Sequence, residues 1–453
     1  MNYVNMFIGM AISVLTVRII GANIFGKYQY CLAIVEFPAV LYSGFDRIIN
    51  RFSATERYED QLKLLLSSYF VHFIVSLVIF FIFFIHFNLY PYLNFAFLNI
   101  TNNEGEKIFY LTFLFCFISG ILNTITTYLN GIRKIQLSQY ASLAISVLNF
   151  LFVLFLYFIR TNNKSDITQL LVGRTFILLA LIIVIIFNFK DLFIKLFFML
   201  LNPKEIKKSL IFTFEKHFKD HASHYQITEI LGYLKDRIAI LILGNFGHFS
   251  GATFYEIIKN VISILRKFFV QMFNVFIPQI VYSHDKNKDQ FVKRFKYFSH
   301  GQFFITCLAA VGIIFVTSLI LKIYSLENLK SYYFITYLEC LTLVVTAWAN
   351  SNNFALEMFK DSKSIMEAAI GRTLIVSILS PILISKFEVT GAAWALLTST
   401  ISNILFLCFK NRKNALWSNY ENIQCSFVFA ITVVILYFCI DISFKLYSQF
   451  LII

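Results

Sequence analysis

The chain has 453 residues, of which 58% are hydrophobic and only 14% charged, and its mean hydropathy is +0.71. Soluble proteins carry about 25% charged residues, so this chain has too few charges to cover a water-facing surface. Its formal net charge of +14 would suit a nucleic-acid-binding protein, but the cations gather mainly in short segments between long apolar runs. This pattern predicts an all-α polytopic membrane protein and no nucleic-acid partner.

An apolar run of about 20 residues spans the hydrocarbon layer, and it must be helical there to satisfy its backbone hydrogen bonds. Thirteen runs fit this description. In chain order they cover residues 2–20, 28–50, 64–87, 108–130, 138–159, 168–188, 222–244, 252–280, 299–321, 332–357, 366–385, 389–409 and 424–440. The apolar tail 441–453 is short, so we expect about 12–14 transmembrane helices.

Lysine and arginine in the connecting loops predict the orientation of the bundle. The loops after even-numbered runs hold 22 of these cations, whereas the loops after odd-numbered runs hold 7. Because positively charged loops stay on the cytoplasmic side, we expect the amino terminus in the cytoplasm.

The longest connection, 189–221, divides the runs into two groups of six that look alike. Each group opens with a helix ending in a glycine, Gly21 or Gly244, followed by a turn that contains phenylalanine and glycine. Six helices per repeat is an even number, so the halves point the same way and are related by a pseudo-two-fold axis along the membrane normal. We therefore expect two bundles around a central cavity, with these parts: an amino-terminal six-helix bundle over 1–188, a cytoplasmic linker over 189–221, a carboxyl-terminal six-helix bundle over 222–413, and one or two extra helices over 414–453.

Two segments resemble a known family. Residues 18–28 read RIIGANIFGKY, similar to the opening pattern R-x-L-G-x-x-x-F/Y-G-x-Y of lipid-linked oligosaccharide flippases. Residues 236–244 read DRIAILILG, similar to the seventh-helix pattern of the same proteins. These flippases are the O-antigen and polysaccharide exporters of the multidrug/oligosaccharidyl-lipid/polysaccharide (MOP) superfamily. The resemblance implies a carrier that moves undecaprenyl-diphosphate-linked glycan units from the cytoplasmic to the outer leaflet.

Ten lysines and arginines lie in or near the predicted helices, where a buried cation costs at least about 2.5–3.5 kcal/mol. A diphosphate headgroup brings two phosphates into the bundle, and cations that contact it offset part of its desolvation. We therefore predict that the diphosphate is bound by Arg18, Arg237, Lys259 and Arg266. The alternative is that such cations form internal ion pairs, because Glu256 and Lys259 lie three positions apart on one helix. Arg18 could instead snorkel to the outer interface.

Two further groups of polar residues are candidates for substrate and ion contacts. A patch late in the helix 332–357 could hydrogen-bond sugar hydroxyls, or form the cytoplasmic end of that helix: Asn350, Asn352, Asn353 and Glu357. The acids Asp236 and Glu256 could couple transport to a proton or Na⁺ gradient, or serve in structural pairs.

Catalytic and nucleotide-binding motifs are absent, so the sequence predicts no catalytic residue, no cofactor and no metal site. The leading hypothesis is a flippase in a bacterial inner membrane, not an enzyme. Its partners would be the lipid-linked oligosaccharide, membrane lipids and the polysaccharide polymerase machinery. One alternative is a cation-coupled multidrug antiporter of the same superfamily. Another is a membrane glycan polymerase or glycosyltransferase, although the longest outward loop, 88–107, has only Glu104 and Glu106 as acids.

Overall fold

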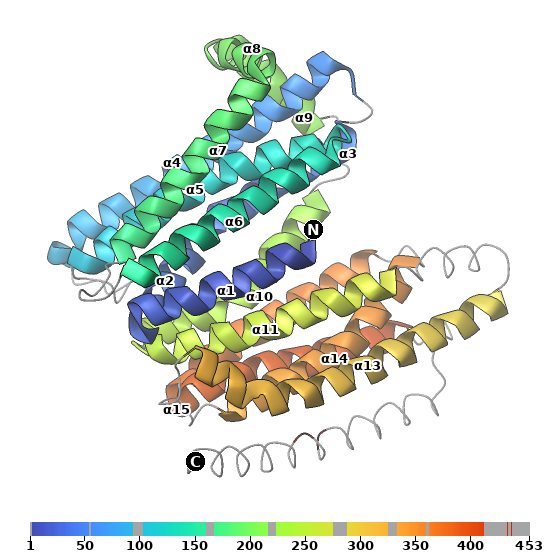
Figure 1. The fold of residues 1–453 in the computed structure, drawn as a ribbon. Helices are drawn as coiled ribbons and strands as arrows, with labels where there is room; N and C mark the ends of the chain where they lie inside the picture. The colour runs from blue at the N-terminus through green and yellow to red at the C-terminus, as the bar shows by residue number, and fades with distance from the viewer. Residues whose placement is uncertain are drawn as a thin grey trace. The chain divides into compact units, whose positions relative to one another are not determined.

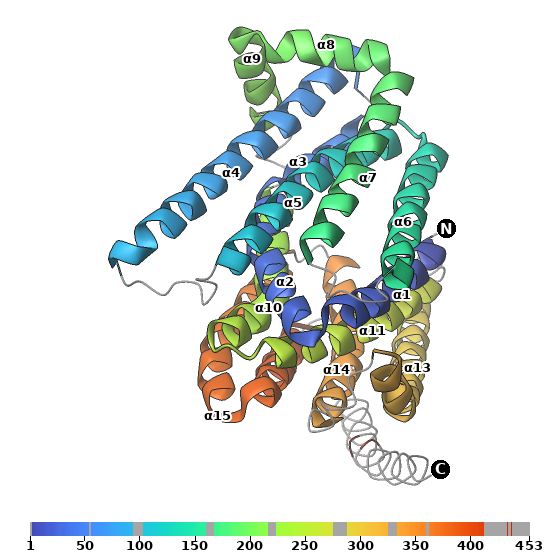
Figure 2. The same ribbon diagram turned by 60° about the vertical axis from the view of Figure 1, so that its left-hand side comes forward.

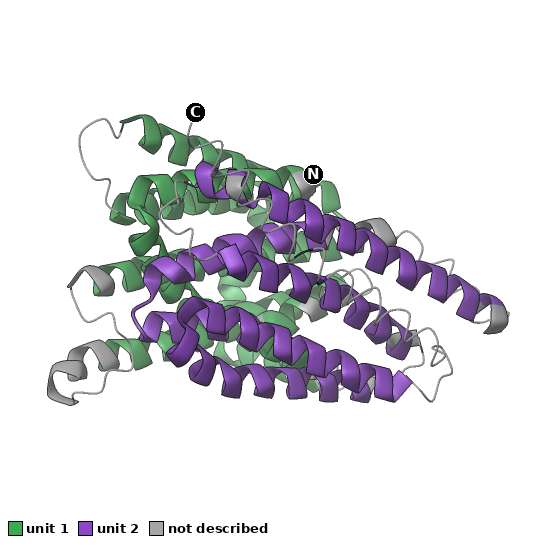
Figure 3. Ribbon diagram, turned by 90° about the horizontal axis from the view of Figure 1, so that it is seen from below, with its two compact units in different colours: residues 1–233 green, residues 234–453 purple. Residues whose placement is uncertain are grey.

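The computed structural model describes most of the chain, and every regular element in this part is a helix (Figure 1). The described residues are 2–53, 56–93, 103–159, 167–215, 223–274, 288–324, 333–358 and 362–411, together with Val433 and Leu436. The chain forms two compact units, residues 1–233 and residues 234–453 (Figure 3).

The amino-terminal unit is a helical bundle organised around one central helix, α5. Its elements are α1 (Asn2–Ile20), α2 (Ala22–Val35), α3 (Phe37–Phe52), α4 (Tyr58–Leu93), α5 (Asn103–Gly131), α6 (Ile135–Ile159), α7 (Ile167–Asn188), α8 (Lys190–Leu200), α9 (Pro203–Thr213) and the first part of α10 (Ser223–Asn245). Helix α5 packs against α2, α3, α4, α6 and α7. Leu122, Ile125 and Leu129 on α5 form an apolar core with Leu178 and Ile182 on α7.

The carboxyl-terminal unit has the same kind of arrangement, with α14 at its centre. Its elements are the rest of α10, α11 (Phe249–Asn274), α13 (Lys288–Ile323), α14 (Tyr333–Met358) and α15 (Ser362–Asn411). Helix α14 packs against α11, α13 and α15. Most of its residues between positions 335 and 349 are buried, so both faces of this helix are covered by protein.

The predicted spans agree closely with the observed helices. Twelve of the thirteen lie on helices of the described part, and the fold class is confirmed. The span 28–50 is interrupted at Glu36, because α3 starts there with Pro38 in its first turn and proline cannot donate the hydrogen bond that would continue α2. The span 424–440 falls outside the described residues except for Val433 and Leu436.

The linker predicted over 189–221 contains two short helices. The backbone at Phe189 leaves the helical region, with φ −121° and ψ 36°, and separates α7 from α8. Asn202 then caps α9 by accepting a hydrogen bond from the backbone amide of Lys204, and Pro203 occupies the first turn, where proline is well tolerated. Figure 2 shows α8 running across the ends of α4 and α7.

Helix α15 contains a sharp turn at Glu388, which has φ 51° and ψ −129°. The turn lies between the predicted spans 366–385 and 389–409, so it joins two helices rather than kinking one. Gly391 makes the turn possible, because a Cβ atom at this position would lie 2.2 Å from the carbonyl oxygen of Leu383.

Six helices of the described residues are long and apolar enough to cross a membrane; they belong to α4, α5, α6, α7, α13 and α15. Helix α6 shows how these surfaces meet lipid, because Leu151, Phe155 and Phe158 are all more than half exposed. Exposing such an apolar surface to water is unfavourable, whereas exposing it to the hydrocarbon of a bilayer is not. The chain is a multi-pass membrane protein. The cytoplasmic placement of the amino terminus and the central cavity stay predictions.

Candidate functional site

The carboxyl-terminal unit gathers charged side chains from four helices in its interior. They are Lys235, Asp236 and Arg237 on α10, Glu256, Lys259 and Arg266 on α11, Glu339 on α14, and Arg372 on α15. We call these eight residues the charged cluster. Charged side chains inside a membrane protein cost free energy and tend to face a bundle interior or a water-filled path. A cluster of eight charged residues therefore needs a physical explanation.

The first pair in the charged cluster joins α10 to α11. Arg237 donates a hydrogen bond from Nη1 to Oε1 of Glu256 at 2.9 Å, and the two side chains are 18% and 6% exposed. Asn260, one turn further along α11, lies 3.5 Å from the same oxygen. The second oxygen of Glu256 is buried and has no hydrogen-bond partner among the described residues. Arg237 therefore pairs with one carboxylate oxygen of Glu256, and the other oxygen makes no hydrogen bond within the described part of the chain.

The second pair also joins α10 to α11. Lys259 donates a hydrogen bond to the backbone carbonyl of Asp236, and its Nζ lies 3.9 Å from the carboxylate oxygen Oδ1 of the same residue. Lys235 approaches that oxygen to 3.2 Å. The Asp236 side chain is 42% exposed, so one accessible carboxylate faces two ammonium groups, and the positive charge is not fully balanced locally.

Glu339 and Arg372 extend the charged cluster to α14 and α15. Glu339 is 2% exposed and lies close to the Tyr255 hydroxyl and to the cations Lys259 and Arg372, which attract its carboxylate. Arg372 donates from Nη2 to the Thr400 hydroxyl at 2.7 Å. The Nε of Arg372 is buried without a hydrogen-bond partner in the part of the chain that the structure describes.

Formal charges in this cluster do not cancel. Five cations face three acids, which leaves a surplus of two positive charges. Arg266 is close enough to interact electrostatically with Asp236, and it repels Lys235 and Arg372. Such a surplus inside a membrane unit is unfavourable by itself and becomes favourable when an anion enters. The arrangement is suited to a ligand that carries more than one negative charge.

The structure brings together three of the four cations predicted to contact a diphosphate. Arg237, Lys259 and Arg266 belong to the charged cluster, whereas Arg18 lies in the last turn of α1 in the amino-terminal unit, where it is half-buried. The predicted acids Asp236 and Glu256 lie in the charged cluster as well. The local pair Glu256–Lys259, considered as an alternative, does not form as an ion pair, because each residue finds its counter-charge on α10 instead.

The predicted sugar-contacting residues lie at the other end of α14 from Glu339. Asn352 is fully buried, and Asn411 donates hydrogen bonds to its side-chain and backbone oxygens, both at 3.0 Å. Asn350 and Asn353 are half-buried. The side chain of Glu357 falls outside the described residues. A sugar contact at these positions stays a prediction.

Sequence reasoning did not select four residues of this site: Lys235, Tyr255, Glu339 and Arg372. A signal was present for three of them, because each is a charge within a long apolar helix. Tyr255 carried no such signal, since the chain has 24 tyrosines and only the packing of α11 against α14 turns this one toward Glu339.

The amino-terminal unit has a buried acid of its own. Asp46 on α3 is 8% exposed and accepts hydrogen bonds from Ser68 at 3.2 Å, Asn123 at 3.1 Å and Thr124 at 3.0 Å. The donors are neutral and come from α4 and α5. Among the side chains that the structure describes, this group ties three helices together through neutral donors alone, in contrast to the charged cluster.

The family model of polysaccharide biosynthesis proteins matches residues 1–284. The chain belongs to this family. The resemblance read from residues 18–28 and 236–244 is thereby confirmed. A search of curated protein sequences found no match.

Solved structures with the same fold are transporters of the MOP superfamily. An inward-facing multidrug resistance transporter of the MATE family is 15% identical, with a TM-score of 0.66, and the match covers 91% of this chain and 95% of that one. The lipid II flippase MurJ, in an inward closed conformation, is 15% identical with a TM-score of 0.56, covering 100% and 98%. A MOP transporter from Pyrococcus furiosus is 14% identical with a TM-score of 0.56, covering 91% and 95%. The fold is therefore that of a whole MOP transporter.

Proposed function

We propose that this protein is a flippase that moves undecaprenyl-diphosphate-linked oligosaccharide units from the cytoplasmic to the outer leaflet of a bacterial inner membrane. The unit would be an O-antigen or another surface polysaccharide repeat. Family membership supports a role in polysaccharide biosynthesis, and the MOP fold supports transport by alternating access. The protein would act as a carrier and not as an enzyme.

The observation that carries the proposal is the positive surplus of the charged cluster. A lipid-linked diphosphate must take its negative charges through the membrane, and paired or hydrogen-bonded cations are the groups that make this tolerable. Arg237, Lys259 and Arg266 would contact the diphosphate. Arg18, which belongs to the amino-terminal unit, stays the fourth candidate for this contact.

The acids of the charged cluster would set when the anion is released. Asp236 and Glu256 already hold Lys259 and Arg237, so they compete with phosphate for the same cations. Uptake of a proton or Na⁺ by either acid would free its cation for the substrate. The flipped unit would then be passed to the polysaccharide polymerase machinery at the outer face.

A gene deletion tests the direction of transport. The strain is expected to accumulate lipid-linked glycan in the cytoplasmic leaflet, and the wild-type gene should restore export. Single replacements Arg18→Gln, Arg237→Gln, Lys259→Gln and Arg266→Gln should each lower export at equal protein level in the membrane. Lys386→Gln is the matched control, because Lys386 is exposed on α15 and lies outside the charged cluster. Wild-type export from all four variants would contradict the proposed site.

The same experiment separates the rival functions. A glycan polymerase or glycosyltransferase would leave unpolymerised units in the outer leaflet, or form glycosidic bonds when purified. A cation-coupled multidrug antiporter would export hydrophobic cations from cells and leave lipid-linked glycan unchanged. The surplus of cations in the charged cluster disfavours this last function, because it would repel a positively charged drug.

A further inference from the structure

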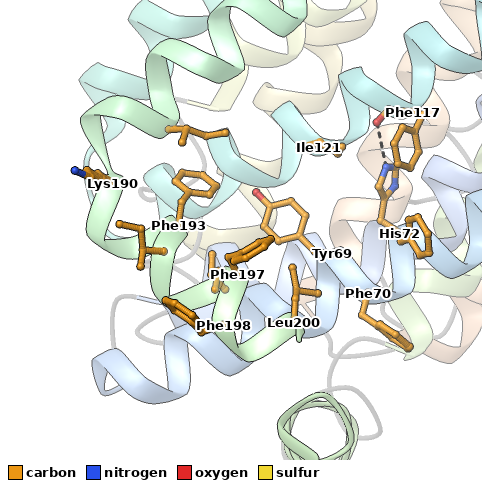
Figure 4. A pocket seen from close by; sticks show the side chains of 14 residues that line it. Tyr69, Phe70, His72, Phe117, Ile121, Lys190, Phe193, Phe197, Phe198 and Leu200 are labelled. Atoms are coloured by element: carbon orange, nitrogen blue, oxygen red, sulfur yellow. Dashed lines mark hydrogen bonds between the residues drawn. The ribbon is translucent and has the colours of Figure 1, made fainter. Parts of the chain in front are cut away.

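A pocket of about 810 Å³ lies in the amino-terminal unit and shares no residue with the charged cluster (Figure 4). Its walls come from α4, α5, the end of α7, and α8. Volumes of this order are typical of ligand pockets. Neither the proposed diphosphate site nor the Asp46 group includes a side chain that lines it.

The lining of the pocket is almost wholly hydrocarbon. Of its fourteen residues, eleven are apolar, and six of these are phenylalanines from α4, α5 and α8. His72 does not change this character, because its ring stacks on Phe117 at 5.1 Å between centroids and its Nε2 is hydrogen-bonded at 3.1 Å to the Phe117 carbonyl. The interior therefore suits a hydrocarbon chain and excludes a sugar.

The hydroxyl of Tyr69 is the polar group of the pocket lining that bears on the choice of ligand. The hydroxyl of Tyr69 is buried and makes no hydrogen bond within the described part of the chain. In Figure 4 its oxygen faces Phe193, among the lining side chains. Burying an unbonded hydroxyl costs roughly 1–3 kcal/mol. A ligand with an acceptor near its hydrocarbon part, such as an ester carbonyl, would supply the missing bond.

The mouth of the pocket carries positive charge. Lys190, the first residue of α8, lines the pocket with its aliphatic stem, and Figure 4 shows its ammonium group pointing outward. Lys134 lies over the ring of the neighbouring Phe189 at 5.0 Å. Asp191 is the one carboxylate next to Lys190 in the chain. A lysine that buries its stem and extends its charge to the interface is well placed to meet a lipid phosphate.

Helix α8 has the composition of a helix that lies in the membrane interface. Leu192 and Leu196 face the protein core, while Ile194, Phe197 and Phe198 are exposed. Figure 2 shows α8 running across the end of α7. An apolar helix in this position, with the charged residues Lys190 and Asp191 at its start, belongs at the level of the phospholipid headgroups.

We propose that this pocket binds an anionic glycerophospholipid of the surrounding bilayer. One acyl chain fills the space between α4, α5 and α8. The ester carbonyl accepts a hydrogen bond from the Tyr69 hydroxyl, and the phosphate lies at Lys190. The charge at the mouth favours a phospholipid over the polyprenyl diphosphate substrate. A single phosphodiester charge is matched by Lys190 together with Lys134, which lies over the neighbouring Phe189 ring, whereas a diphosphate calls for the larger positive surplus of the charged cluster. Because the bound lipid is not the substrate, the inference is independent of the glycan.

The test uses the full-length protein in phosphatidylcholine vesicles that contain phosphatidylglycerol with a photoactivatable acyl chain. After illumination, labelled residues are mapped by mass spectrometry. Labelling is expected at the residues of α4, α5 and α8 that line the pocket; it should saturate, and unlabelled phosphatidylglycerol should displace it. Lys190→Gln should require about fivefold more lipid for half-saturation, since one lysine near a membrane surface contributes about that factor. Ile121→Phe, which narrows the pocket from α5, should lower the labelling of the lining residues.

Lys195→Gln is the matched control. Lys195 lies on the same helix, with its Nζ 4.9 Å from the ring centre of Tyr58, and it does not line the pocket. Its replacement should leave the half-saturation unchanged. Labelling that does not saturate and spreads evenly over α6 and the other lipid-facing helices would overturn the proposal. Displacement by polyprenyl diphosphate but not by phosphatidylglycerol would overturn it as well. Should Ile121→Phe fail to fold, saturation and displacement in the native protein decide the matter.

Discussion

Arg237 on α10 and Glu256 on α11 form an ion pair of 2.9 Å between two helices of the carboxyl-terminal unit. Both side chains are largely shielded from solvent, so water screens the attraction between the two charges only weakly. Breaking such a pair from one side leaves the other charge buried, which is more costly than removing both charges together.

Replacing Arg237 with alanine is therefore expected to destabilise the protein by about 3–5 kcal/mol, because Glu256 would remain buried next to Asn260 alone. Thermal unfolding of the purified protein in detergent measures the effect. The double variant Arg237→Gln with Glu256→Gln should recover most of the loss, because no uncompensated charge remains. Equal melting temperatures for Arg237→Ala and this double variant would show that an unpaired Glu256 carries no such cost.

The same pair shows what the sequence could and could not predict. Helix positions follow from hydrophobic runs, because a segment within hydrocarbon has no structural alternative to a helix. Which charge pairs with which depends on how each helix is rotated against its neighbours. Local spacing suggested Glu256 with Lys259, whereas the packing of α10 against α11 supplies Arg237 and Asp236 as partners.

The helix breaks and the short helices have recognisable signals in the sequence, but only in part. Pro38, Asn202 and Pro203 are ordinary signals for a helix start, and the structure uses each of them in that way. The turn at Glu388 carries a weaker signal, since Gly391 is needed for a close approach to Leu383 that only the folded chain creates. The division into two six-helix halves with a linker over 189–221 stays a prediction, and the position of Glu339 next to Tyr255 and Arg372 depends on packing that the sequence does not give.

Asp46 offers a test of a buried carboxylate that has no cation. Asp46→Asn is expected to be neutral or stabilising, because the amide oxygen can still accept from Ser68 and Thr124, and Asn123 can turn its own amide to accept from the new one. Asp46→Ala should destabilise by about 1–3 kcal/mol for each donor left buried and unbonded. Thermal unfolding of both variants checks this, and a large loss in Asp46→Asn would show that the negative charge itself holds α3, α4 and α5 together.

Thr400 is the acceptor that orients Arg372 within the charged cluster. Thr400→Val keeps the shape and removes the acceptor, so we expect a loss of about 1.5–3 kcal/mol, the range for hydrogen bonds to charged groups. Ser377→Ala is the control on the same helix as Arg372, because the Ser377 hydroxyl donates to the Thr373 carbonyl of its own helix and its loss should change little. Equal melting temperatures for the two variants would indicate that Arg372 does not depend on Thr400.

Two glycines of α15 are expected to respond to alanine in opposite directions. At Gly391 a Cβ atom would lie 2.2 Å from the carbonyl oxygen of Leu383 and 2.7 Å from the nitrogen of Ile384. Backbone atoms cannot swing aside as a side chain can, so Gly391→Ala should destabilise by about 1–3 kcal/mol or more. At Gly371 nothing lies within 4 Å of the same atom, and Gly371→Ala should stabilise the helix by up to about 1 kcal/mol. Melting temperatures of the two variants, measured side by side in detergent, should therefore move apart around the wild-type value; a similar fall in both would mean that the turn at Glu388 does not depend on the close approach of Gly391.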